Sequence, residues 1–397
     1  MSKPALETTQ LTLGVIPLTD SAPLVVAEAA GFFASEGLDV ALDTVRSWAA
    51  MRDKLAAGRI EGATLLAPMP LAAAFGLDPV ATPILTVKAL SQGGSGFCVT
   101  PELHARLCEH GAAESATPLE WAQAMRHLVE AERGTRPAPT LAHVYPYSTH
   151  HYELRYWLAS VGLHPELDLN LVTVPPPLMV QQLEAGRIDG AWVGSPWPAL
   201  AQARGVAKVL FDKRQFWNGG PEKVFAVTQP WAEAHPATLA ALLRALIAAG
   251  RWLDAPSNHA QAAAWLQASL MPDISTSLLA DELKTLRFHE GLVGFPWRSH
   301  SRWLLEQMRR WQHLPPAADL ERAVGSCRPD LYRSVARSLG EPLPVVDEKL
   351  EGAHEAPYVL QGESGALTLP ADRIMDGISY DPEGLHFTAT TLRRKPV

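Results

Sequence analysis

The sequence predicts a two-lobed α/β protein with a ligand cleft between its lobes. The chain of 397 residues is long enough for two domains. A segment of its first part recurs later in the chain, and in both copies short strands alternate with helices of about ten residues. Because strands that alternate with helices form parallel βαβ units, each copy is expected to build its own α/β layer.

The repeat is clearest where a predicted helix gives way to the strand that follows it. Residues 55–63 read Leu-Ala-Ala-Gly-Arg-Ile-Glu-Gly-Ala, and residues 183–191, 128 positions later, read Leu-Glu-Ala-Gly-Arg-Ile-Asp-Gly-Ala. A pair of prolines follows each copy at the same offset, and a strand-like segment precedes each copy at an offset of 129. We interpret the match as duplication of a structural unit. The alternative is that two ordinary helix–strand corners converged on the same turn residues.

The elements follow from hydrophobic spacing and from the glycines that end helices. In the first unit we expect a strand at 11–16, a helix at 22–34, a strand at 38–45, a helix at 49–57 and a strand at 63–66. In the second unit the same order predicts a strand at 143–145, a helix at 150–161, a strand at 167–174, a helix at 178–185 and a strand at 190–193. Beyond about residue 230, helices are expected at 232–253, 258–270, 275–286 and 299–311.

These elements divide the chain into four parts. Residues 10–93 form the first part of lobe 1, and residues 94–222 form lobe 2. Residues 223–340, which are mainly helical, complete lobe 1. The tail at 341–397 is rich in proline, glycine and acidic residues, so we expect irregular structure with some short strands packed on the body.

Composition excludes several classes of function. The net charge is −8 with no long basic block, which argues against direct nucleic-acid binding. No run of about 20 apolar residues predicts a membrane span. The first ten residues are polar and lack a basic region followed by an apolar core, so we expect no signal peptide and a cytoplasmic protein.

The usual signatures of catalysis are missing from the sequence. It contains no GxSxG, HExxH or CxxC motif, and its glycine-rich stretches do not match a nucleotide-binding fingerprint. Its three cysteines, at 98, 108 and 327, show neither disulfide nor metal spacing. We therefore expect a binding protein without catalytic residues, metal or cofactor, and not an enzyme.

Candidate binding residues lie in the turns that follow the predicted strands. Ligands of open α/β sheets bind beyond the carboxyl ends of the strands, near helix N-termini. These turns carry hydroxyls, the indole of Trp48, the imidazole of His150, and Gly194, a set that suits a small oxyanion. Lys223 begins the strand expected to return the chain to lobe 1 and would lie at the cleft floor. The plainer alternatives are packing for Trp48 and solvent exposure for His150 and Lys223.

Several short segments resemble the nitrate-binding proteins of ABC transporters, the NrtA proteins, and the related bicarbonate-binding CmpA group. The resemblance extends over roughly residues 10–340 and is carried by the segments at 16–25, 47–55, 66–70, 152–159, 193–197, 221–225, 295–297 and 328–332. It implies a type II periplasmic-binding-protein fold with nitrate bound between two α/β lobes. The residues that match the family's nitrate contacts are Trp48, His150, Gly194 and Lys223. At the hinge position where the family has an amide side chain, this sequence has Ser95. Gln92, three residues away, could supply the amide in its place. This departure from the family leaves the preference for nitrate or nitrite open.

Within this family the chain looks most like the cytoplasmic sensor NasS. The resemblance implies a nitrate/nitrite sensor of nitrate assimilation that holds an ANTAR-type RNA-binding antiterminator similar to NasT and releases it when the anion binds. The alternatives are a substrate receptor of an ABC transporter and an enzyme of the thiamine-pyrimidine-synthesis group. A stripe of Trp303, Leu304, Met308 and Trp311 is either a partner surface or core packing.

Overall fold

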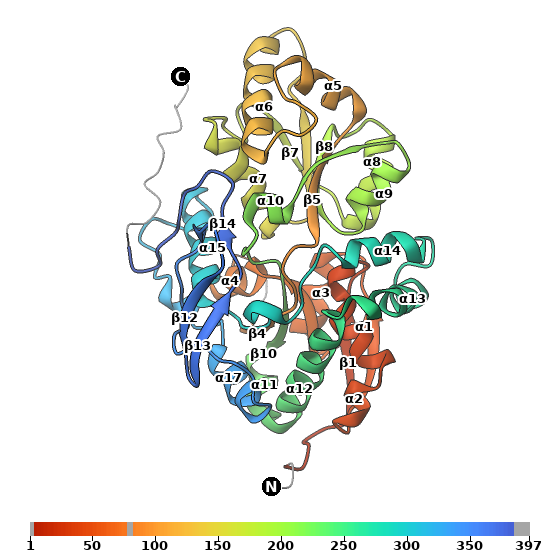
Figure 1. Ribbon diagram of the computed structural model, residues 1–397, viewed down its shortest axis with the longest axis vertical. Helices are drawn as coiled ribbons and strands as arrows, with labels where there is room; N and C mark the ends of the chain where they lie inside the picture. The colour runs from red at the N-terminus through yellow and green to blue at the C-terminus, as the bar shows by residue number, and fades with distance from the viewer. Residues whose placement is uncertain (1–3, 78–81, 385–397) are drawn as a thin grey trace.

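Two five-stranded sheets form the centres of two lobes, which lie one above the other in Figure 1. The computed structural model describes residues 4–77 and 82–384. The sheet of lobe 1 has the order β2-β1-β3-β10-β4 and that of lobe 2 the order β7-β6-β8-β5-β9. The strands of lobe 1 are β1 (Gln10–Val15), β2 (Asp39–Thr44), β3 (Gly62–Leu66), β4 (Ile84–Ala89) and β10 (Lys223–Thr228). Those of lobe 2 are β5 (Ser95–Val99), β6 (Thr140–His143), β7 (Asn170–Thr173), β8 (Gly190–Gly194) and β9 (Lys208–Asp212).

The two sheets have the same topology, as the sequence repeat predicts. In each, three strands of the repeated unit are parallel, and the fourth strand, β10 or β5, is antiparallel to its neighbours. Both of these fourth strands follow a passage of the chain from one lobe to the other. The chain leaves lobe 1 through residues 90–94 and returns through residues 213–222, so lobe 2 is one continuous segment and lobe 1 takes β10 from after it.

The repeated residues have matching structural roles. Gly58 follows α3 (Trp48–Ala56) and Gly186 follows α8 (Met179–Glu184), with φ of 64° and 63°, the left-handed conformation that favours glycine. Glu61 accepts a hydrogen bond from the backbone N–H of Thr12 at 2.7 Å, and Asp189 accepts one from Thr140 at 2.7 Å. The acidic residue of each repeat thus fixes the start of the neighbouring strand.

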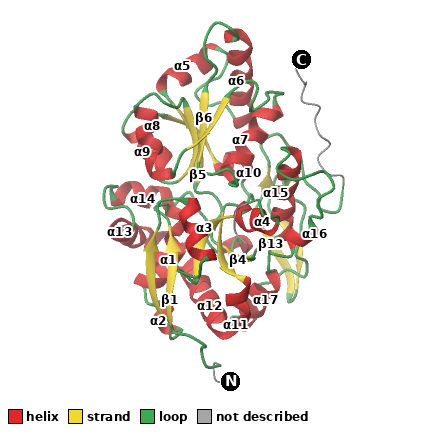
Figure 2. Ribbon diagram, turned by 180° about the vertical axis from the view of Figure 1, so that it is seen from behind, coloured by secondary structure: helices red, strands yellow, loops and turns green. Residues whose placement is uncertain are grey.

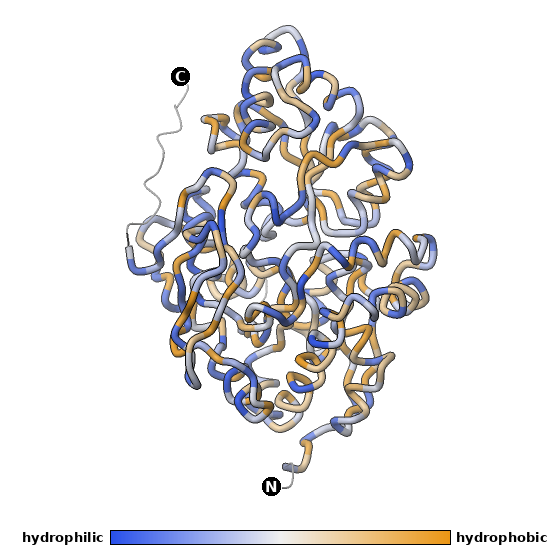
Figure 3. Tube along the Cα trace, viewed as in Figure 1, coloured by the Kyte–Doolittle hydropathy of each residue, from blue (hydrophilic) through white to orange (hydrophobic). Residues whose placement is uncertain are grey.

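Helices cover both faces of each sheet (Figure 2). Those of lobe 1 are α1 (Ala22–Ala29), α2 (Phe32–Ser35), α3 (Trp48–Ala56), α4 (Pro68–Ala74), α11 (Gln229–Ala234), α12 (Pro236–Leu253), α13 (His259–Ser269) and α14 (Thr276–Leu283). Those of lobe 2 are α5 (Pro101–Glu109), α6 (Pro118–Glu132), α7 (Thr149–Ser160), α8 (Met179–Glu184), α9 (Trp197–Ala203) and α10 (Lys213–Trp217). Short 3-10 turns are η1 (Thr19–Ser21), η2 (Pro176–Leu178), η3 (Pro256–Asn258) and η4 (Glu290–Leu292). Hydrophobic residues run through both lobes (Figure 3), as expected for two separate cores.

Three predicted elements differ from the structure. The helix expected at 22–34 is two helices, because Gly31 adopts φ of 75° between them. The helix expected at 232–253 is likewise divided, because Pro236 cannot continue the hydrogen bonding of α11. The strand expected at 143–145 lies earlier, at β6, where Leu141 and Ala142 pair with β8.

Helix α12 is long and apolar enough by composition to cross a membrane. It lies in lobe 1, where 11 of its 18 residues are buried and it packs against α1, α2 and α17 (Pro329–Ser338). Burial in this core accounts for its apolar character.

The C-terminal part of the chain packs along one side of the body (Figure 1). Its elements are α15 (Arg298–Arg310), α16 (Glu321–Val324), β11 (Ala353–His354), β12 (Tyr358–Gly362), β13 (Gly365–Leu369) and β14 (Asp372–Arg373). Trp303 and Met308 of α15 are fully buried, so that stripe is core packing. Lys349 forms buried ion pairs of 2.5 Å with Glu351 and Asp372, which tie this segment together. The last part of the predicted tail, residues 385–397, lies outside the described residues.

Candidate functional site

The cleft between the lobes is lined by strand ends and helix N-termini, as the fold class predicts. Lobe 1 supplies the turn η1, the start of α3 and the start of β10. Lobe 2 supplies the start of α7, the end of β8 and the start of β5, where Ser95 pairs with Gly194. Ser148 caps α7, because its hydroxyl accepts a hydrogen bond from the backbone N–H of His151 at 3.0 Å. This cap holds the first turn of α7, which carries Thr149 and His150, at the cleft.

The carboxylate of Glu222 lies at the centre of the site. Its Oε1 accepts hydrogen bonds from His150 Nε2 at 3.0 Å and Thr149 Oγ1 at 3.2 Å. It also lies 2.5 Å from Nζ of Lys223. Its Oε2 accepts a hydrogen bond from Ser95 Oγ at 3.0 Å. Three of the residues expected from sequence, Ser95, His150 and Lys223, therefore meet on a residue that was not expected.

Lys223 is fully buried and contacts two carboxylates. Besides Glu222, its Nζ lies 2.7 Å from Oδ2 of Asp20 in the turn η1. Burial lowers the pKa of Lys223, but the two carboxylates more than offset that effect and the net pKa is raised. Lys223 is therefore an ammonium at neutral pH, as an oxyanion site requires.

A second buried pair lies behind the first. Lys213, at the start of α10, contacts the carboxylate of Glu153 on α7 and donates to the carbonyl of Pro221 at 3.0 Å. Its Nζ is 3.9 Å from Oε2 of Glu222, which links the two pairs. Burial lowers the pKa of Lys213 to about 7, so its charge responds to conditions near neutrality.

Burial shifts the other ionisable groups of the site. It raises the pKa of Asp20 to about 6, although Lys223 opposes the shift. It lowers the pKa of His150 to about 4, although Glu222 opposes the shift. Since His150 is then neutral at pH 7 and its Nε2 hydrogen-bonds a carboxylate, the proton lies on Nε2, and Nδ1 is an acceptor. The pKa of Glu222 is held well below its usual range by the charge of Lys223, against the effect of burial.

Gly194 lies beside Lys223, whereas Trp48 is placed near the site only through its helix. A Cβ at Gly194 would lie 3.0 Å from Cδ2 of Leu18 and 3.5 Å from Nζ of Lys223. Any larger residue at this position would therefore place side-chain atoms next to the Lys223 ammonium. Trp48 begins α3, which packs against β10, and it is 2% exposed. Its indole Nε1 has no hydrogen-bond partner among the described residues. The indole N–H groups of Trp121, Trp192 and Trp311 are unpartnered within the described part of the chain too, so the lack of a partner does not by itself mark Trp48 as a ligand donor.

Gln92 does not join this cluster. Its Nε2 donates to the carbonyl of Gly219 at 3.1 Å, and its backbone pairs with that of Arg287. It therefore connects the two passages of chain between the lobes. Because Ser95 contacts Glu222 directly, the hydroxyl, and not the amide, reaches the centre of the site.

The two lobes are closed over the site. The backbone N–H of Thr19 donates to the carbonyl of Ser195 at 2.9 Å, and the indole of Trp197 donates to the carbonyl of Pro17 at 3.1 Å. Arg52 of lobe 1 donates to the hydroxyl of Tyr145 of lobe 2 at 2.8 Å. Any ligand exchange at the buried cluster therefore requires these interlobe contacts to open.

Sequence reasoning missed Glu222 at the centre of the site, and it missed the buried pair of Lys213 and Glu153 behind it. Glu222 directly precedes Lys223 in the segment 221–225 that carries the family resemblance. Its position next to a candidate residue could have indicated that Glu222 also belongs to the site. The ion pair between Lys213 and Glu153 joins residues 60 positions apart, and no local pattern indicates it.

One group among the described residues has the composition of a metal site, outside the cleft. His104, Cys108 and Glu114 lie close together on lobe 2. However, His104 faces Glu114 with Nε2 at 3.5 Å and Cys108 with Nδ1 at 3.9 Å. A metal ion binds one nitrogen of an imidazole, so this geometry fits an ion pair, and the expected absence of a metal stays a prediction.

Related proteins share most of the length of this chain. It is 35% identical over 90% of its length to the nitrate import ATP-binding protein NrtC of Synechocystis, and it spans 53% of that protein. It is 27% identical over 99% of its length to the nitrate/nitrite binding protein NrtA of Nostoc, covering 88% of that protein. The chain thus spans about half of the ATP-binding relative and most of the binding-protein relative.

A solved structure has the same two-lobed fold. The periplasmic nitrate-binding protein NrtA of Synechocystis superposes with a TM-score of 0.82 at 28% identity, covering 96% of this chain and 97% of that one. The predicted type II periplasmic-binding-protein fold is confirmed, and the chain is homologous to the NrtA proteins. The model of the NMT1-like family matches residues 4–267, and the chain therefore belongs to the NMT1-like family.

Proposed function

We propose that this protein binds nitrate or nitrite in the cleft between its lobes. The observation that carries the proposal is the set of donors that converge on one planar oxyanion, the carboxylate of Glu222, in a closed and fully buried cleft. The relatives named for nitrate binding support the choice of anion.

The chemistry of the donors suits a small planar anion. Lys223 supplies a point charge, His150 supplies an N–H, and Ser95 and Thr149 supply hydroxyls. The unpartnered indole N–H of Trp48 is a further donor. Removing Nε1–H should cost about 1.5–3 kcal/mol of binding, roughly a tenfold or greater loss of affinity, if it donates to an anion.

Calorimetric titration tests this proposal. Nitrate or nitrite should bind saturably, and Trp48→Phe should weaken binding at least tenfold. Trp192→Phe is a matched control, because Trp192 is also buried with an unpartnered Nε1 but lies on β8 in the lobe 2 core. Absence of binding by both anions would refute the proposal, and unchanged affinity in Trp48→Phe would exclude Trp48 from the site.

We propose further that the protein acts in the cytoplasm as a nitrate/nitrite sensor that binds an ANTAR-type antiterminator similar to NasT and releases it when the anion binds. Support comes from the relative named as an ATP-binding protein, of which this unit makes up about half. A unit similar to this chain therefore also occurs inside a protein named for ATP binding. The role proposed is binding, with no catalytic step.

A surface groove offers a physical route to such regulation. It has a volume of about 420 Å³ and is lined by residues of both lobes, including Arg46 and Pro272 of lobe 1 and Arg204 of lobe 2. Movement of the lobes would change its shape, so a partner bound across it would respond to the anion.

Co-purification of the antiterminator with and without nitrate tests the sensor proposal. Nitrate should release the partner, and association that is unaffected by nitrate would refute it. The alternative, a receptor of an ABC transporter, is favoured by the relatives named NrtA. That alternative predicts that the protein stimulates the ATPase of a reconstituted nitrate transporter and does not bind the antiterminator.

A further inference from the structure

The Glu222 side chain occupies the place that an oxyanion would take. It is 1% exposed, and both of its oxygens are engaged by donors from the surrounding residues. A carboxylate is planar and shares its negative charge between equivalent oxygens, as nitrate and nitrite do. The donors that suit the proposed ligand are therefore already bound to a group of the protein itself.

These contacts join the two lobes. Ser95, Thr149 and His150 belong to lobe 2, whereas Lys223 begins a strand of lobe 1. Glu222 itself lies on the return passage, and its backbone carbonyl accepts from the N–H of Ala67 in lobe 1 at 3.2 Å. The carboxylate therefore makes the same bridge between lobes that a bound anion would make.

The charges leave little room for an added anion. Asp20, Glu222 and Glu153 carry three negative charges when ionised, and Lys213 and Lys223 carry two positive ones, while His150 is neutral. An anion added beside Lys223 would be the third negative group around one ammonium. Exchange of the anion for the Glu222 carboxylate avoids this crowding.

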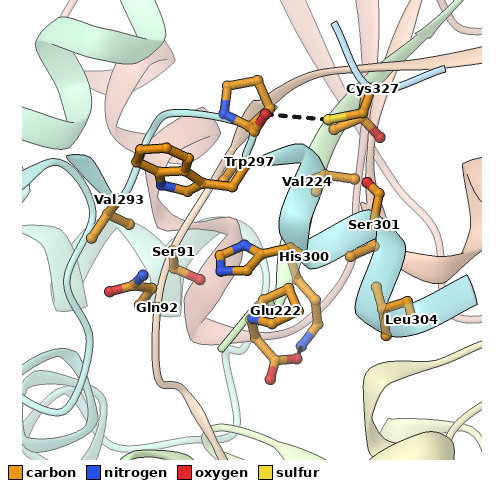
Figure 4. Close-up of a pocket in the computed structure, with 16 residues that line it drawn as sticks. Ser91, Gln92, Glu222, Val224, Val293, Trp297, His300, Ser301, Leu304 and Cys327 are labelled. Carbon is orange, nitrogen blue, oxygen red and sulfur yellow. Dashed lines mark hydrogen bonds and ion pairs between the residues drawn. The ribbon is translucent and has the colours of Figure 1, made fainter. Parts of the chain in front are cut away.

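A small cavity lies beside Glu222 and can receive the displaced carboxylate. It has a volume of about 30 Å³ and is lined by Ser91, Gln92, Glu222 and His300, among others. Figure 4 shows Glu222 next to His300, with Ser91 and Gln92 to one side. The buried hydroxyl of Ser91 has no hydrogen-bond partner among the described residues, so it can donate to a carboxylate that moves there.

From this geometry, and given the anion binding proposed above, we propose that the Glu222 carboxylate is an internal ligand. It occupies the oxyanion position and keeps the lobes closed in the empty protein, and nitrate binds by displacing it. Glu222 thereby sets the affinity of the cleft, since every external anion competes with a tethered one.

Anion titrations of Glu222 variants test the proposal. Glu222→Gln keeps the volume but removes the charge, and it should bind nitrate at least tenfold more tightly than the unmodified protein. Glu222→Ala vacates the position and should bind formate, a free carboxylate, at least tenfold more tightly than the unmodified protein does. Circular dichroism checks that each variant folds, and Glu222→Gln decides the matter if Glu222→Ala does not fold.

Glu153→Gln is the matched control for charge. It removes the same charge from the same buried network, but Glu153 does not contact Ser95, His150 or Lys223 through any of the hydrogen bonds of the cluster. An equal gain of nitrate affinity in Glu153→Gln would overturn the proposal, because net charge alone would then explain it. If the unmodified protein binds nitrate, unchanged or weaker nitrate binding in Glu222→Gln would also overturn it.

Solution X-ray scattering supplies a readout that does not depend on nitrate. The unmodified protein should be closed without ligand, and Glu222→Ala should expand and then contract on addition of formate. Failure of all forms to bind nitrate, with formate closing Glu222→Ala, would refute the proposed function and support the internal ligand. Nitrate binding by the unmodified protein, with no formate binding by Glu222→Ala, would support the proposed function and refute the internal ligand.

Discussion

Replacement of Lys223 by methionine tests the electrostatics of the site most directly. The side chain is fully buried, and its Nζ contacts Asp20 at 2.7 Å and Glu222 at 2.5 Å. Lys223→Met keeps most of the volume but leaves both carboxylates without their shared ammonium. Removing one partner of a buried ion pair costs about 3–5 kcal/mol, a large fraction of the roughly 5–15 kcal/mol by which a protein is stable.

The loss should depend on pH. Asp20 already has a folded pKa of about 6, above the ordinary aspartate pKa of 3.8, so its contribution to stability is present below about pH 4 and is lost as pH rises through 6. Without Lys223, the folded pKa values of Asp20 and Glu222 both rise, because the ammonium lowers each of them. The destabilisation relative to the unmodified protein should therefore be larger at pH 8 than at pH 5.

Urea unfolding followed by circular dichroism at both pH values measures this loss. Lys284→Met is the control, because its pair with Asp281 is exposed at 63% and 71% and should contribute less than about 1 kcal/mol. Adding Glu222→Gln to Lys223→Met should recover part of the stability by removing one stranded charge. A loss below about 1 kcal/mol, or an equal loss at pH 5 and pH 8, would refute the buried charge network.

Three further predictions concern the cleft and the C-terminal segment. Gly194→Val should weaken nitrate binding at least tenfold in calorimetry, because its Cβ would lie 3.0 Å from Leu18 and would obstruct closure beside the ammonium; unchanged affinity would contradict this. Nitrate affinity should rise as pH falls through about 6, because protonation of Asp20 removes a negative charge beside the site, and Asp20→Asn should reduce that rise near pH 6 while leaving the change near pH 7 that comes from Lys213. Lys349→Met should destabilise the protein by about 3–5 kcal/mol in chemical denaturation, because it strands the buried carboxylate of Glu351, and a loss under about 1 kcal/mol would show that the pair is dispensable.

The duplicated α/β unit was visible in the sequence because its signals are local. Gly58 and Gly186 end helices in a conformation that other residues rarely adopt. The carboxylates of Glu61 and Asp189 each accept a hydrogen bond from a backbone N–H of the neighbouring strand. Such positions constrain residue type wherever the unit occurs, so the two copies keep the same or chemically similar residues, and the two-lobed class follows.

The sequence also placed several site residues at the correct end of the sheets. His150 opens a helix and Lys223 opens a strand, and in a sheet of this type those positions meet at the cleft. Gln92 was placed less well, because a side chain three residues from Ser95 in a glycine-rich turn can point in any direction. Its bond to Gly219 depends on the other passage between the lobes.

Only the tertiary structure decided what fills the cleft. Glu222 meets Ser95 and His150 from 127 and 72 positions away, and Lys213 meets Glu153 from 60 positions away. Such contacts depend on how two lobes close on each other, and no period or motif along the chain encodes that closure. The sequence alone determined the repeated unit, whereas the folded arrangement determined that donors from both lobes converge on a buried carboxylate of the protein.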